Sequence, residues 1–85
     1  MKEEHTHTFV DTYDGLVGFG ADRETDEATV QVYLQKFSDD AFMKALLPRL
    51  SDAELEEVFD LVNRLLVRHL NESEYHRLFL KDGTH

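Results

Sequence analysis

The sequence predicts an all-α fold, a compact single-domain bundle of about five short helices, and three observations support this class. Residues 50–55 and 70–75 share one helix-start pattern, in which Ser51 or Asn71 is followed three residues later by glutamate. This is the capping box, flanked in both cases by apolar residues that can close as a staple. Apolar residues recur with helical spacing along most of the chain, and the stop signals fall between these stretches.

The first helix is expected over residues 8–18. Phe9, Tyr13, Leu16 and Val17 recur at the spacing of one helix face, and the glycine that ends the range supplies a stop. Residues 1–7 contain only one apolar side chain and are predicted to be a flexible N-terminal tail. No linker or repeat divides the remainder, so residues 1–85 are predicted to form a single helical domain.

The second helix is expected to begin with Thr25 as its cap, and Val30, Tyr33, Leu34 and Phe37 recur in it at helical spacing. Apolar and polar residues also alternate over 28–35, which fits a half-buried strand and makes an α+β fold the alternative. An isolated strand would need a pairing partner, and no other segment offers one. The length of the segment and its start signal favour the helix.

Two further helices follow, and the second carries the strongest pattern in the chain. A helix begins at Ser38 and ends near Leu47, because the residue before Pro48 resists the helical conformation. The next runs from 52 to 70. We expect one side of this helix to be buried in the core, where it packs against at least two neighbouring helices. That side consists of Leu55, Val58, Phe59, Val62, Leu65, Leu66, His69 and Leu70.

A last helix is predicted over residues 71–81, with Gly83 as its stop. The face formed by Tyr75, Leu78 and Phe79, together with Leu80, holds more apolar surface than so small a domain readily buries. These four residues are therefore the candidate interface to a protein partner or to a second copy in a homodimer. The alternative is an ordinary core with scattered apolar residues at the surface.

Net charge narrows the classes of partner. Eighteen acidic residues against nine basic ones give −9, a field that repels phosphate, so nucleic acid and anionic membranes are not expected partners. Cysteine is absent, and no apolar run is long enough to span a bilayer, which fits a cytoplasmic protein. No catalytic motif stands out, and no enzyme activity is predicted.

Histidine supplies the only candidate cofactor chemistry. His69, His76 and Glu72 lie close in sequence, and two imidazoles with a carboxylate suit zinc or iron; His5 and His7 are candidate additional ligands. The spacing matches no helical metal motif. The structural alternatives are a His69 that interacts with the negative end of its helix and a His76 paired with Glu72. A metal-binding helical protein is accordingly the alternative to an acidic interaction or regulatory module.

Four strings, at residues 12–16, 23–26, 37–42 and 74–79, are similar to sequences of small uncharacterised bacterial cytoplasmic proteins. The resemblance covers most of the chain. It implies a bacterial, cytoplasmic origin and implies no activity, cofactor or site residue.

Overall fold

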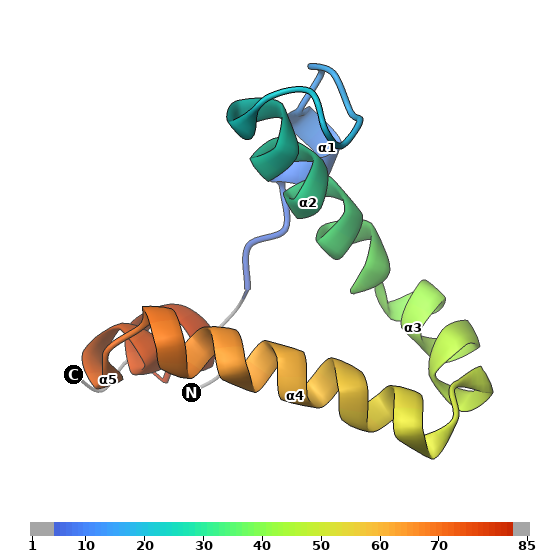
Figure 1. Cartoon of the computed structure of the whole chain (residues 1–85), viewed down its shortest axis with the longest axis vertical. Helices are drawn as coiled ribbons and strands as arrows, with labels where there is room; N and C mark the ends of the chain where they lie inside the picture. Colours follow the sequence, from blue (N-terminus) through green and yellow to red (C-terminus); the bar gives the residue numbers. More distant parts are fainter. Residues whose placement is uncertain (1–4, 83–85) are drawn as a thin grey trace. The chain divides into compact units, whose positions relative to one another are not determined.

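The computed structural model describes residues 5–82, and within this range the chain is helical and contains no strand (Figure 1). Its α-helices are α1 (Phe9–Thr12), α2 (Arg23–Phe37), α3 (Asp40–Leu46), α4 (Asp52–His69) and α5 (Glu72–Glu74). A 3₁₀ turn, Leu47–Arg49, follows α3, and a π-helical turn, Tyr75–Leu80, follows α5. The all-α class with about five short helices is confirmed, and the residues of the alternative strand lie inside α2.

The structure groups the chain into two units, which are described separately. Unit 2 is Thr6–Arg49, with α1, α2 and α3, and unit 1 includes everything from Leu50 onward, with α4 and α5. The single domain over residues 1–85 stays a prediction.

The first helix is much shorter than the sequence predicts, and the expected range 8–18 is wrong beyond Thr12. Tyr13 is already extended, and its hydroxyl donates a hydrogen bond to the carbonyl oxygen of Leu16 at 2.9 Å. The Tyr13 ring lies over Gly15 so closely that a Cβ there would collide with it. Leu16 and Val17 are consequently exposed instead of continuing a buried stripe.

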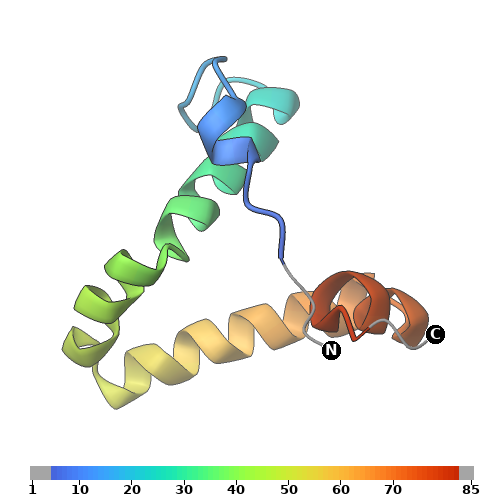
Figure 2. The same cartoon turned by 180° about the vertical axis from the view of Figure 1, so that it is seen from behind.

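Two hydrogen bonds far apart in sequence fasten this N-terminal segment to α2. The backbone N–H of Val10 donates to Oε1 of Gln35, and that of Gly18 donates to Oγ1 of Thr29, both at 2.9 Å. The views in Figures 1 and 2 agree that α1 lies against α2. Thr29 and Val32, at 5% and 6% exposure, are the only described residues that are buried, so the small core of unit 2 is centred on this face of α2.

Helix α2 begins earlier than predicted, because Asp22 and not Thr25 is its cap. The Asp22 carboxylate accepts hydrogen bonds from the backbone N–H of Thr25 at 2.8 Å and from the Thr25 hydroxyl at 3.1 Å. The buried face also differs from the predicted one. Tyr33 and Leu34 are exposed, since the N-terminal segment covers the side of α2 that carries Thr29 and Val32.

Acid is expected to weaken the start of α2. The hydrogen bond from the Thr25 backbone N–H, followed by that from its hydroxyl, lowers the pKa of Asp22 below its ordinary 3.8. Because the charged carboxylate is favoured in the folded state, its contribution is complete above about pH 3.8 and is lost as the pH falls through the lower folded pKa. An NMR pH titration of the Thr25 amide should follow this loss.

The matched control is Asp22→Asn, because asparagine caps a helix equally well and does not titrate. Its Thr25 amide should keep one position over the same range. A Thr25 amide that titrates identically in Asp22→Asn would assign the transition to another acid and contradict the prediction.

Helix α3 is capped by Asp39, one residue after the predicted Ser38. Ser38 still belongs to the end of α2, because its N–H bonds the carbonyl oxygen of Leu34, while the Asp39 carboxylate accepts from the N–H of Phe42 at 3.1 Å. The α-helix ends at Leu46 and passes into the 3₁₀ turn that contains Pro48, close to the predicted end.

Both predicted capping boxes are confirmed. At the start of α4, Ser51 Oγ accepts from the N–H of Glu54 at 3.1 Å, and the Glu54 carboxylate accepts from the N–H of Ser51 at 2.9 Å. Asn71 and Glu74 make the same reciprocal pair at 2.8 and 2.9 Å. The predicted stop at Gly83 lies outside the described residues; within them Lys81 adopts the left-handed conformation directly after the π turn.

Candidate functional site

An exposed apolar surface of unit 1 runs along α4, and we call it the α4 stripe. It consists of Leu55, Val58, Phe59, Val62, Leu65 and Leu66. The first five are exposed, from 41% at Val62 to 67% at Phe59, and the sixth is half-buried. Within unit 1 this face is therefore not covered, contrary to the prediction that it lies in a core. The pattern correctly places these residues on one face, but within residues 50–82 no other helix packs along it.

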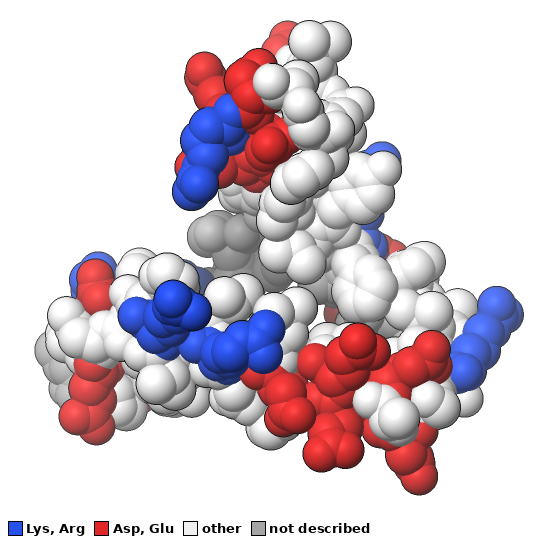
Figure 3. Space-filling model, viewed as in Figure 1, with Lys and Arg blue, Asp and Glu red and all other residues white. Residues whose placement is uncertain are grey.

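Charge is graded along the same helix. Figure 3 shows acidic side chains towards one end of α4 and basic ones towards the other. The acidic residues are Asp52, Glu54, Glu56, Glu57 and Asp60, and the basic ones are Arg64 and Arg68, followed by His69 in the last turn. Each group faces the end of the helix dipole that stabilises it. Arg64 and Arg68 form no ion pair with any residue in 5–82, so both guanidinium groups are available to a partner.

The four candidate interface residues follow in the π turn, and the structure divides them into two groups. Tyr75 and Phe79 stack on each other, with ring centroids 5.5 Å apart and planes inclined by 14°, and Tyr75 is half-buried. Leu78 and Leu80 are exposed. A π turn is rare and was not predicted, because the capping box fixes only where the segment begins.

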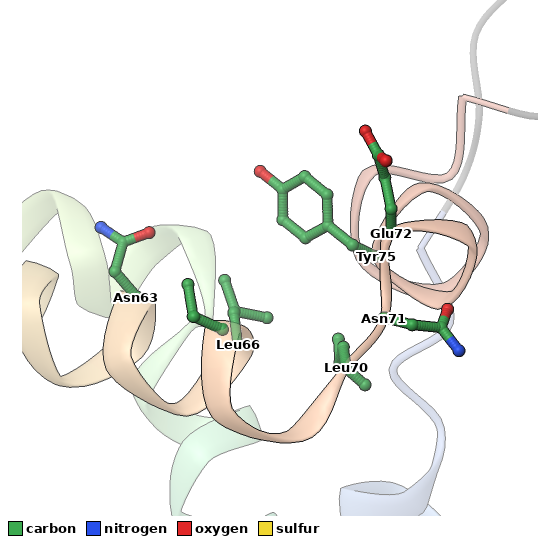
Figure 4. Close-up of a pocket in the computed structure, with 7 residues that line it drawn as sticks. Asn63, Leu66, Leu70, Asn71, Glu72 and Tyr75 are labelled. Atoms are coloured by element: carbon green, nitrogen blue, oxygen red, sulfur yellow. The ribbon is translucent and has the colours of Figure 1, made fainter.

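An open groove of about 300 Å³ lies between the end of α4 and the π turn (Figure 4). It is lined by Asn63, Leu66, Val67, Leu70, Asn71, Glu72 and Tyr75. In Figure 4 the Tyr75 ring reaches from the π turn back towards Leu66. The groove extends the α4 stripe towards the C-terminal segment and is mainly apolar, without a cluster of groups suited to catalysis.

The predicted metal ligands are not gathered into one site. His69 is exposed in the last turn of α4 and Glu72 is exposed at the start of α5, while Nδ1 of His76 lies 2.6 Å from Oδ2 of Asp82. His5 and His7 are exposed before α1. Residues 5–82 contain no group of three or more histidine or acidic side chains placed to hold a metal ion.

Unit 2 carries a second apolar surface, which is not among the sites predicted from the sequence. Phe19 and the exposed α2 residues Val30, Tyr33 and Leu34 line a groove of about 320 Å³. The signal was present in the helical spacing of the α2 residues. Spacing alone does not distinguish a covered face from an open one.

The chain matches no family model, no curated protein and no solved structure. No helix in residues 5–82 combines the length and the apolar character required to cross a membrane. Fold and surface define an all-α protein whose unit 1 presents an amphipathic helix that the rest of the described unit does not cover.

Proposed function

We propose that the protein is an interaction module that self-associates through the apolar surface of unit 1. This surface combines the α4 stripe with the residues predicted from the sequence, Tyr75, Leu78, Phe79 and Leu80. The observation that carries the proposal is the exposure of the α4 stripe on a helix of 18 residues. An apolar patch of this kind on a small protein marks an interface.

Energetics supports the proposal. The two buried residues of the described chain, Thr29 and Val32, both belong to unit 2, so unit 1 by itself leaves its described apolar side chains at least partly in water. Each square ångström of apolar area withdrawn from water contributes about 25 cal/mol. A chain of 85 residues is near the size at which association commonly supplies stability that a small core does not. Self-association through unit 1 would withdraw the α4 stripe from water.

Composition favours a protein as the partner. The net charge of −9 opposes binding to the phosphate backbone of nucleic acids. Both signs of charge are nevertheless present beside the α4 stripe, with basic groups in the second half of the helix. A protein surface with apolar residues at its centre and mixed charge at its rim resembles the usual composition of interfaces.

The test is the mass of the intact chain across a dilution series, measured by sedimentation velocity together with amide NMR spectra. We expect the mass to rise towards that of an oligomer as concentration increases. Amide shifts should then change along the α4 stripe and the π turn, while the resonances of α1 and α2 serve as an internal control. The mass of a single chain at every concentration would overturn the proposal.

A further inference from the structure

We infer that two copies pair through α4 in an antiparallel arrangement, with the α4 stripes facing each other around a two-fold axis. The inference rests on the proposed self-association and specifies its geometry. The α4 stripe of one copy is thus covered by α4 of a second copy.

The apolar spacing on α4 is that of a helix-pairing seam. Leu55, Val58, Val62 and Leu65 are separated by three, four and three residues, the alternation that places side chains at the a and d positions of a heptad. His69 continues the series four residues later. Side chains with this spacing pack into the gaps between side chains of a second helix with the same spacing, and a flat surface offers no such gaps.

Charge selects the direction of pairing. The acidic half of α4 and its basic half lie at opposite ends of one helix (Figure 3). Antiparallel pairing places the acidic half of each copy beside the basic half of the other, while parallel pairing places like charges together. Complementary flanking charges set the orientation of paired helices, so the antiparallel form is favoured.

Seam and charge give the same register. If Leu55 of one copy faces Leu65 of the other, Val58 faces Val62, and all four side chains meet an apolar partner. One edge of the seam then carries Glu54, Leu61 and Arg68, at intervals of seven residues. In this register Leu61 lies near its own counterpart at the two-fold axis.

Along that edge, Glu54 of each copy lies beside Arg68 of the other. One oxygen of the Glu54 carboxylate accepts from the Ser51 N–H, which leaves the second oxygen for the guanidinium group. Arg68 has no ion pair within the described part of its own chain. Two equivalent ion pairs therefore flank the seam.

The chain contains no cysteine, so single cysteine variants report this geometry without background. We would prepare Leu55→Cys and Leu65→Cys and oxidise each alone and as an equal mixture. Positions 55 and 65 are about 15 Å apart along a helix, far beyond the roughly 4–7 Å between Cα atoms in a disulfide. We expect a covalent dimer in the mixture and little in either variant alone.

Val67→Cys is the control, because Val67 is 83% exposed and points away from the stripe. Val67→Cys should form little covalent dimer by itself, when mixed with Leu55→Cys or when mixed with Leu65→Cys. Efficient cross-linking of each seam variant with itself would indicate parallel pairing and overturn the inference while leaving self-association intact. An oligomeric mass without cross-linking at either seam position would also overturn it, and a monomeric mass would instead contradict the proposed function.

A second pair of variants leaves the seam itself unchanged. Arg68→Glu is expected to weaken self-association at low salt by about tenfold or more, because each dimer loses two ion pairs and gains two repulsive ones. Arg49→Glu, in unit 2, changes the net charge equally and should have a much smaller effect. Equal effects of the two variants would show that overall charge and not the Glu54–Arg68 edge governs pairing, which would overturn the register.

Discussion

Replacing Leu65 by alanine is expected to raise the dissociation constant of the self-associated form roughly 10- to 100-fold. Leu65 is 47% exposed in the single chain, so about half of its apolar surface is still available for burial in an interface. Full burial of a leucine contributes about 1.5–3 kcal/mol. Both copies of a two-fold dimer carry the substitution, so the half of this free energy that burial in the interface would supply is lost twice. Sedimentation across a dilution series measures the change.

Two comparisons separate this prediction from a simple loss of stability. Val67→Ala, on the outer face of the same helix, should leave the dissociation constant nearly unchanged. At concentrations where the chain is monomeric, Leu65→Ala should also change the free energy of unfolding only slightly. A loss of about 2–5 kcal/mol there would be the cost of a buried leucine, and would place Leu65 in a core instead of an interface.

Replacing Thr29 by valine is expected to destabilise unit 2 by about 1–3 kcal/mol. Thr29 is 5% exposed, and its Oγ1 both donates to the carbonyl oxygen of Thr25 at 2.7 Å and accepts from the N–H of Gly18 at 2.9 Å. Valine has nearly the same shape but leaves the Gly18 N–H without its acceptor. Chemical denaturation, together with hydrogen exchange of the Gly18 amide, measures the effect.

The control for this substitution is Thr29→Ser, which keeps the hydroxyl and removes only a methyl group. Exchange of the Gly18 amide should stay slow in Thr29→Ser and become faster in Thr29→Val. A Thr29→Val variant as stable as the parent would show that this hydrogen bond does not hold the N-terminal segment against α2.

Helix starts marked by a complete capping box were predictable from the sequence, because their interactions are local. The hydrogen bonds between Ser51 and Glu54, and between Asn71 and Glu74, span three residues and form whatever the rest of the chain does. The end of α3 near Pro48 is similarly local, since proline restricts the residue before it. The Asp22 cap of α2 is equally local, but Thr25 offers a competing capping residue three positions later in the sequence.

The length of α1 and the buried side of α2 depended on contacts that spacing does not reveal. The Val10–Gln35 and Gly18–Thr29 hydrogen bonds join residues 25 and 11 positions apart. They fasten an extended segment where the sequence pattern favours a longer helix. They also cover the α2 face around Thr29, so Tyr33 and Leu34 remain exposed.

Helical periodicity alone predicts the all-α class, the residues of the α4 stripe and the order of charge along α4, because it decides which residues share a face. Packing between segments, in contrast, leaves the stripe uncovered within unit 1 and brings no three histidine or acidic side chains of residues 5–82 together as a metal site. Periodicity describes one helix at a time. Whether a face is covered, or ligands converge, depends on neighbours that packing between distant segments supplies.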